Sequence, residues 1–130
     1  ERRAGRVIST EKASGPSPFK CMPTVVLIDA GSASASEITA GALRDHKAAT
    51  LVGAKTFGKG SVQRVDKLSG GEELKLTIAR WYTPSSKNID KEGIKPDIEV
   101  QITNEQRKAG ADPQKDKAYE LLNQKIGSAN

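Results

Sequence analysis

The chain has 130 residues, 35% of them hydrophobic, which suits one small domain or a piece of one, and no apolar run is long enough for a membrane span or signal-peptide core. Its single cysteine, Cys21, excludes internal disulfides and cysteine-rich zinc sites, and its single histidine, His46, disfavours other metal sites, so we predict neither a metal nor a cofactor. The formal net charge of +5 comes from scattered basic residues that do not alternate with aromatic ones, which argues against a nucleic-acid partner.

The first half of the chain predicts a strand, a helix and a second strand. Residues 1–23 contain several glycines and prolines and predict an irregular arm or loop. Residues 24–28 form a continuous β-branched apolar run, typical of a strand buried on both faces of a parallel sheet. Residues 34–46 place small and apolar side chains on one helical face, and residues 49–53 predict a second buried strand. These elements form one right-handed crossover unit, which indicates an α/β fold.

The next part of the chain predicts further β-strands after a glycine-flanked loop. A short strand is expected at residues 62–65, and alternation of Leu74, Leu76 and Ile78 with polar residues predicts a strand with one buried face. A last short strand is expected over residues 98–102, where apolar side chains alternate again.

The end of the chain predicts a helix. Asp112 is suited to cap it, Pro113 fits its first position, and Ala118, Leu121, Leu122 and Ile126 recur at helical spacing. We therefore divide the chain into the arm, an α/β core and a C-terminal helical segment, with bounds 1–23, 24–103 and 104–130.

Ser34 is the first candidate for chemistry. It lies at a strand-to-helix turn, where the N–H groups at a helix start can stabilise an anion. Ser34 and Glu37 also match the Ser-x-x-Glu capping box, in which both side chains only satisfy backbone donors. Ser32 and Ser36 are candidates by residue type as well, so the residues themselves leave the nucleophile open.

A serine nucleophile needs a base, and the sequence offers two. His46 lies about 18 Å from Ser34 if both are on one helix, since each residue adds 1.5 Å. At that distance we do not expect it to act as the base. Lys59, between Gly58 and Gly60, is the alternative base, although a solvated loop lysine fits the same pattern.

A phosphate-binding loop is a rival interpretation of the segment around Lys59. Residues 53–59 match Gly-x4-Gly-Lys, but Gly60 stands where such a loop needs Ser or Thr for magnesium. The segment that follows also has the pattern of a strand where that loop needs a helix, so we do not expect nucleotide binding here.

Several motifs together resemble one protein family. They occur in order between about Thr24 and Val100 and comprise Gly-Ser-Ala-Ser-Ala-Ser-Glu-Ile at 31–38, Ala-Gly-Ala-Leu at 40–43, Lys-Thr-Phe-Gly-Lys-Gly-Ser-Val-Gln at 55–63 and Gly-Ile-Lys-Pro-Asp at 93–97. The chain is similar in these motifs to the C-terminal processing peptidases, also called tail-specific proteases. The resemblance implies a crotonase-like or Clp-like α/β protease core, of which this chain would be the C-terminal part.

The resemblance also implies roles for particular residues. By motif, the nucleophile falls on Ser34, the general base on Lys59, and the glutamine that orients the lysine on Gln63. The backbone N–H of Ala35, at the helix start, is a candidate oxyanion donor, together with Gly31 of the same turn. Glu37 fits either a capping or a supporting role beside the site.

The implied activity is that of a serine endopeptidase. Family members cleave unstructured proteins near their C-terminal tails, and here a Ser-Lys dyad would act through an acyl-enzyme. They generally work outside the cytoplasm, in the periplasm, cell wall or a lumen, and carry a PDZ domain, while homo-oligomerisation stays open. Two departures stand out: residues 1–23 lack the family's Asp-Leu-Arg segment, and Ser86 stands where glycine is common. A non-catalytic peptide-binding module of the same fold, inactive without an upstream segment, is the alternative.

Overall fold

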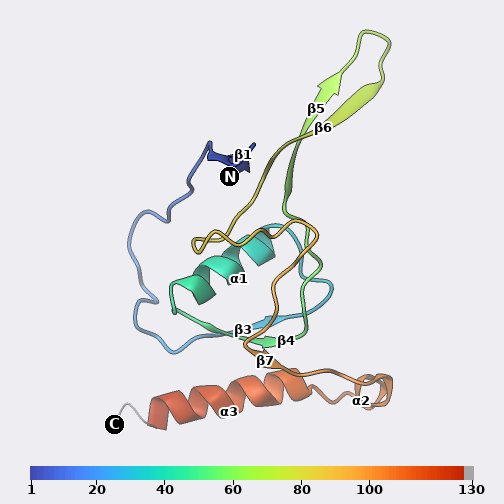
Figure 1. Cartoon of the computed structure of the whole chain (residues 1–130). Coiled ribbons are helices and arrows are strands. Elements are labelled where there is room, and N and C mark those ends of the chain that lie inside the picture. The colour runs from blue at the N-terminus through green and yellow to red at the C-terminus, as the bar shows by residue number, and fades with distance from the viewer. Residues whose placement is uncertain (128–130) are drawn as a thin grey trace.

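The computed structural model describes residues 1–127, and it contains two sheets and three helices over that range (Figure 1). The elements in chain order are β1 (Arg2–Arg3), β2 (Arg6–Val7), β3 (Val25–Ile28), α1 (Ala35–Asp45), β4 (Thr50–Gly53), β5 (Ser61–Lys67), β6 (Glu73–Arg80), β7 (Ile98–Glu99), α2 (Asn104–Lys108) and α3 (Pro113–Gly127). One sheet has the order β3-β4-β7 and the other the order β2-β1-β6-β5. No helix within residues 1–127 is both long enough and apolar enough to cross a bilayer.

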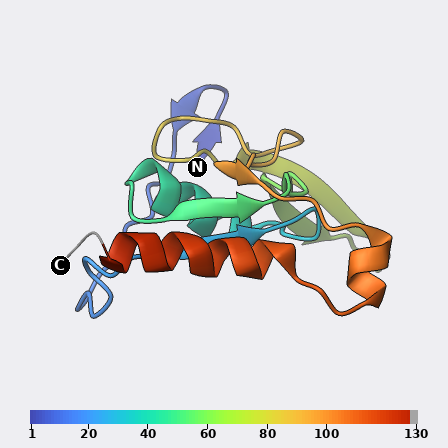
Figure 2. The same ribbon diagram turned by 90° about the horizontal axis from the view of Figure 1, so that it is seen from below.

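The β3-β4-β7 sheet forms the centre of the fold. Its strands are parallel, and α1 connects β3 to β4, so the predicted crossover unit and the α/β class are confirmed. Helix α1 packs on β4 from one side and α3 covers β3 and β4 from the other, as the two views show (Figure 1 and Figure 2). The core between α1 and the sheet is made of Ile28, Ala40, Leu51 and Ile94.

Two sequence predictions for this sheet need correction. β3 is not buried on both faces, because it is an edge strand of the sheet and its Leu27 is 43% exposed. β7 ends at Glu99 rather than residue 102, although the Val100 N–H still donates to the Gly53 carbonyl at 2.9 Å. In both cases the apolar pattern is present, but the edge of the sheet provides too few neighbours to cover or pair the residue.

The hairpin of β5 and β6 extends away from the rest of the molecule (Figure 1). Both strands were predicted, but the expected buried face is wrong, since Leu74 and Leu76 are 44% and 37% exposed. Alternation shows that one face of a strand is apolar, whereas burial needs another element to cover it. A register shift between Val62 and Gln63 interrupts the ladder near the start of β5.

The first residues are more ordered in secondary structure than the predicted irregular arm. β1 and β2 form a short antiparallel hairpin, and Arg2 of β1 pairs with Arg80 of β6. The Arg2 guanidinium also lies 4.8 Å from the centre of the Tyr82 ring and donates to the Ser86 hydroxyl at 2.6 Å. These contacts with distant residues explain why local sequence did not predict the two strands.

The C-terminal helix begins where the sequence places it. Asp112 accepts a hydrogen bond from the Lys115 N–H at 3.0 Å, and α3 starts at Pro113, so the predicted cap and first helical position are confirmed. The sequence did not predict α2, which is capped by the hydroxyl of Thr103. The last three residues of the predicted segment, 128–130, lie outside the described residues.

Candidate active site

Ser34 has an unusual backbone conformation at the junction between β3 and α1. Its φ of 57° and ψ of −117° belong to a region that L-residues with a side chain rarely adopt. It is the residue immediately before the helix, and its side chain is exposed. Strain of this kind persists only where the surrounding contacts hold it, and it is typical of functional positions.

The turn before Ser34 is held by Asp29. Its Oδ1 atom accepts hydrogen bonds from the N–H groups of Gly31 at 2.9 Å and Ser32 at 3.1 Å. The Gly31 N–H, an expected oxyanion donor, is therefore already engaged in this conformation. The Ala35 N–H, at the first position of α1, has no hydrogen-bond partner among residues 1–127. It belongs to the N-terminal end of the helix, where anions bind well.

Glu37 connects the Ser34 turn to the loop that contains Lys59. Its side chain is fully buried, and its Oε2 atom accepts from the N–H groups of both Ser34 (2.9 Å) and Lys59 (2.8 Å). Its Oε1 atom accepts from the Gly58 N–H at 2.8 Å and from the Thr56 hydroxyl. Because one oxygen binds both amides, the backbone nitrogens of Ser34 and Lys59 lie no further apart than the sum of these two distances.

The capping box predicted only part of this role. The bond from the Ser34 N–H to Glu37 is the local one that the motif implies. The other three bonds reach a segment about twenty residues away and could not be inferred from local spacing.

Thr56 is a residue that the sequence analysis missed. It is buried, and its hydroxyl donates to Glu37 while accepting the Ile94 N–H at 2.7 Å. Its own N–H donates to the Ile94 carbonyl at 3.1 Å. Thr56 thus joins the loop of Lys59 to the segment around residue 94. Its place in the same motif as Lys59 was the only available signal.

The glycines beside Lys59 allow close contact with the segment 89–93. A Cβ atom on Gly60 would lie 2.5 Å from the Asp90 nitrogen, and Gly58 has a φ of 92°. The carbonyls on either side of Lys59 are also bonded, since that of Gly58 accepts the Lys91 N–H and that of Gly60 accepts the Trp81 N–H, both at 2.8 Å. The backbone at Lys59 is therefore fixed on both sides.

A phosphate-binding loop is not formed here. The strand β5 begins at Ser61, directly after the glycine-flanked loop, and no helix N-terminus follows Lys59. Such a loop needs the helix start for its anion, so this interpretation is excluded by the fold.

The three neighbouring serines differ in what their hydroxyls do. The Ser32 hydroxyl donates to Asp29 Oδ1 at 3.2 Å, and the Ser36 hydroxyl donates to the Ala33 carbonyl at 2.7 Å. The Ser34 hydroxyl donates no hydrogen bond to any residue in 1–127. Ser34 is thus the serine of this turn whose proton is available to a base.

The side chains of the predicted dyad are near one another in backbone position but do not touch. Ser34, Lys59 and Gln63 are all exposed, and none of their side chains is hydrogen-bonded to another within the described range. Gln63 lies on β5 opposite Thr77, just after the register shift. The structure therefore brings the backbones of Ser34 and Lys59 together and leaves the contact between the side chains unmade.

His46 does not join this group. It is the C-cap of α1, and Ser34 is the N-cap, so the two lie at opposite ends of the helix as predicted. In the part of the chain that the structure describes, no three His, Cys, Asp or Glu side chains gather as a metal-ligand set.

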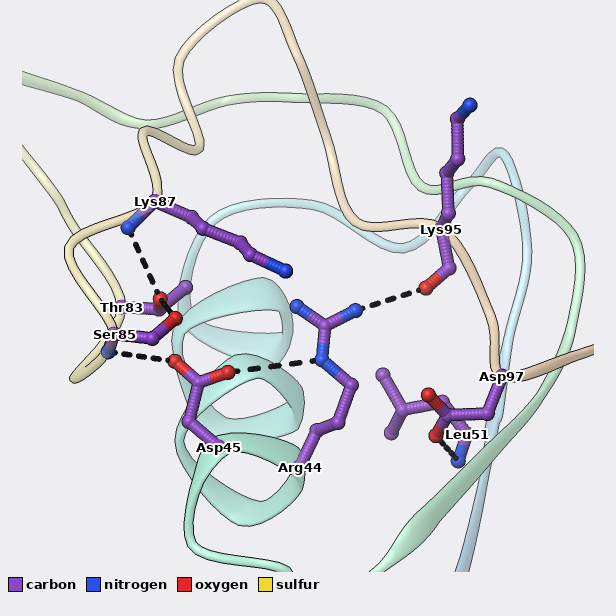
Figure 3. A network of polar contacts seen from close by, with 8 residues as sticks. All are labelled: Arg44, Asp45, Leu51, Thr83, Ser85, Lys87, Lys95 and Asp97. Atoms are coloured by element: carbon purple, nitrogen blue, oxygen red, sulfur yellow. Dashed lines mark hydrogen bonds and ion pairs between the residues drawn. The ribbon is translucent and has the colours of Figure 1, made fainter.

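The far end of α1 is held by a separate polar network (Figure 3). Asp45 accepts the Ser85 N–H at 2.9 Å, and Arg44 donates to the Lys95 carbonyl at 3.0 Å. Partial burial acts to raise the pKa of Asp45, but hydrogen bonds from Thr83 and Ser85, together with the Arg44 charge, hold this pKa below its ordinary value. The network fixes the segment that carries residues 89–93, which in turn packs on the loop of Lys59.

Comparison with known proteins identifies the family. The model of peptidase family S41 matches residues 1–100. The chain belongs to peptidase family S41. Its S41 relatives include the carboxy-terminal-processing protease of Bartonella bacilliformis, 56% identical over 79 residues that are 61% of this chain and 18% of the relative. The carboxyl-terminal-processing protease of Synechocystis sp. is 48% identical over 103 residues, 77% of this chain and 24% of the relative.

A solved structure extends the family likeness to the fold. The photosystem II D1 C-terminal processing protease is 47% identical, with a TM-score of 0.58 over 61% of this chain and 20% of that one. The chain therefore spans about a fifth to a quarter of the length of these relatives. The resemblance to C-terminal processing peptidases and the α/β fold class inferred from the motifs are both confirmed.

Proposed function

We propose that this S41 chain contributes the nucleophile and the general base of a serine endopeptidase. The observation that carries the proposal is the shared contact of Glu37 Oε2 with the N–H groups of Ser34 and Lys59. It keeps a strained, exposed serine beside a lysine whose backbone is fixed on both sides. Acyl transfer requires a base within reach of the nucleophile, and a shared buried contact keeps the two segments close enough for that.

The reaction proceeds in two balanced halves. The neutral amine of Lys59 takes the Ser34 hydroxyl proton as Oγ attacks the carbonyl carbon of a peptide bond. The Ala35 N–H stabilises the negative charge on the carbonyl oxygen. The C–N bond then breaks, and the leaving amine takes the proton from the Lys59 ammonium. A water molecule, deprotonated by Lys59, attacks the acyl-enzyme, and its proton returns to the Ser34 oxygen as the acid is released.

The side chains must move for this chemistry. The side chains of Ser34 and Lys59 are exposed and not hydrogen-bonded to each other, so rotation about their side-chain bonds is needed to bring oxygen and nitrogen within about 3 Å. Gln63, on the strand that follows Lys59, is the residue we propose to hold the lysine amine. Substrate binding along the open edge of β5 would restrict both side chains.

The proposal extends to the protein context by family likeness. We take residues 24–103 as part of a protease core and 104–130 as a C-terminal helical segment. The substrates would be polypeptides with unstructured C-terminal tails, cleaved outside the cytoplasm, and a PDZ domain would belong to the full-length protein.

The experiment compares cleavage of an unstructured reporter polypeptide by the chain and two variants. Ser34→Ala removes the nucleophile. Lys59→Arg keeps the positive charge, but arginine stays protonated and cannot act as the base. We expect cleavage by the parent chain and none by either variant. Ser69→Ala is the matched control and should cleave normally, because this serine is exposed in the turn between β5 and β6.

The alternative function, a non-catalytic peptide-binding module, gives a different result. The open edge of β5 favours it, since an extended peptide adds to such an edge through backbone hydrogen bonds. In that case the reporter would bind equally to the parent chain and to Ser34→Ala, and neither would cleave it. Full cleavage by Lys59→Arg would exclude the lysine-base mechanism.

A further inference from the structure

A basic cavity lies at the other end of α1 from Ser34. Its volume is about 450 Å³, and its lining comes from the end of the helix, from Lys55 shortly after β4, and from the segment 83–95. Its charged lining consists of Arg44, Lys55, Lys87, Lys91 and Lys95, with Glu92 as the single acid. The basic residues are scattered in the sequence, but the fold brings five of them to the lining of this one cavity.

The lysine charges in the cavity are not neutralised by the protein. Among residues 1–127, none of the amines of Lys55, Lys87, Lys91 and Lys95 has an ion pair or hydrogen bond. Each is exposed, so water screens the repulsion between them. Like charges gathered at one concave place still raise the local positive potential and attract an anion of matching charge.

Arg44 gives the cavity a fixed donor. Its side chain is only 18% exposed, and its position is held by the Lys95 carbonyl at 3.0 Å and by Asp45 at 3.7 Å. Figure 3 shows the Lys87 side chain extending toward the guanidinium of Arg44. A planar guanidinium held in this way retains N–H groups for an oxyanion, which it binds better than an amine does.

Lys91 is fixed by its backbone. It has a φ of 63°, in the left-handed region, and its N–H donates to the Gly58 carbonyl at 2.8 Å. The backbone of Lys91 therefore has a defined place on the cavity wall, from which its side chain can turn toward a ligand. The contact also joins the cavity wall to the loop of Lys59.

The size and lining indicate the class of ligand. A cavity of several hundred Å³ suits a small molecule, and no aromatic side chain lines it as a platform for stacked bases. Several cations beside one space, with Lys87 extending toward Arg44 and the Lys95 amine pointing away from it (Figure 3), favour a compact anion with more than one charge. We propose that this cavity binds a phosphate-class polyanion, with Arg44 as the central donor and Lys87 and Lys91 as flanking charges. These residues lie outside the proposed catalytic group, so the inference does not depend on it.

The test is calorimetric titration of the chain with inorganic pyrophosphate and, separately, with adenosine diphosphate. We expect saturable binding of pyrophosphate at one site per chain. Equal binding of adenosine diphosphate would mean that the site accepts phosphoryl groups carried by larger molecules. Binding of pyrophosphate alone would identify free inorganic phosphates as the source.

Charge-matched variants decide whether the cavity is the site. Lys87→Gln with Lys91→Gln should weaken binding about a hundredfold, because each of the two charge-assisted contacts is worth roughly tenfold. Lys67→Gln with Lys75→Gln, on the hairpin outside the cavity, removes the same charge and should change affinity less than about twofold. Equal weakening by both pairs, no saturable binding, or tighter binding of an aspartate-rich peptide at this site would overturn the proposal.

Discussion

Replacing Glu37 by glutamine is the substitution that most directly tests how the site is held together. The carboxylate accepts four hydrogen bonds, two at each oxygen, and offers no donor. In Glu37→Gln one oxygen becomes an NH₂ group that faces two donors. Two hydrogen bonds to a charged group are lost in a fully buried place, at about 1.5–3 kcal/mol each, so the free energy of unfolding should fall by about 3–6 kcal/mol.

Urea denaturation measures this change through the fluorescence of the single tryptophan, Trp81, whose backbone N–H donates to the Gly60 carbonyl beside Lys59. With a slope of about 1–3 kcal/mol per molar urea, the midpoint should move by roughly 2 M. Glu73→Gln is the control, because this exposed glutamate should change stability by less than about 0.5 kcal/mol. Amide exchange adds a local signal, since the N–H groups of Gly58 and Lys59 should lose protection in Glu37→Gln.

A loss below about 1 kcal/mol in Glu37→Gln would refute the reasoning, because two unmet buried donors cost more than that. If this variant does not fold, Thr56→Val tests the same network with a similar shape. It removes the bond to Glu37 and the one from Ile94, so stability should fall by about 2–3 kcal/mol. Full stability of Thr56→Val would likewise contradict the view that the network of Glu37 and Thr56 stabilises the fold.

Three other features of the fold give predictions. Gly60→Ala should cost about 3 kcal/mol in unfolding free energy, because its Cβ would lie 2.5 Å from the Asp90 nitrogen; an unchanged melting temperature would contradict this contact. Ser86 has a φ of 66°, and both Ser86→Gly and Ser86→Ala lose the bond from Arg2, so the glycine variant should be the more stable by about 1 kcal/mol in the same assay. The lowered pKa of Asp45 contributes stability that is fully present at pH values above the ordinary carboxyl pKa, near 4. This contribution is lost as pH falls through the pKa of the folded state. The stability difference between the parent chain and Asp45→Asn, measured by urea from about pH 6 to pH 2, should therefore shrink toward acid pH, and a constant difference would exclude this linkage.

The secondary structure was predictable where local patterns suffice. The β3-α1-β4 unit followed from an apolar run and helical spacing, and α3 from a capping aspartate before a proline. The exposure of Leu74 and Leu76 was not predictable, because alternation identifies an apolar face but not whether another element covers it. β1 and β2 were missed for a similar reason, since their pairing depends on the distant strand β6.

The candidate site could be proposed from the sequence by residue type but not by geometry. The motifs single out Ser34 and Lys59, and the structure links their backbones through Glu37, a residue for which the local pattern predicted only a cap. Ser86 has a left-handed φ, which glycine adopts without strain, and this fits the glycine that the resemblance implies at this position. No local pattern reveals which hydroxyl of three neighbouring serines is left unbonded, because this depends on how the turn closes on Asp29 and Ala33.

The central claim is that Ser34 is the nucleophile and Lys59 its base. A fluorophosphonate probe forms a stable bond with an activated serine oxygen, and mass spectrometry of the digested chain locates the modified residue. The account predicts one adduct, on Ser34, which is absent from Ser34→Ala and strongly reduced in Lys59→Arg. An adduct on Ser32 or Ser36, or equal labelling of the parent chain and Lys59→Arg, would contradict it.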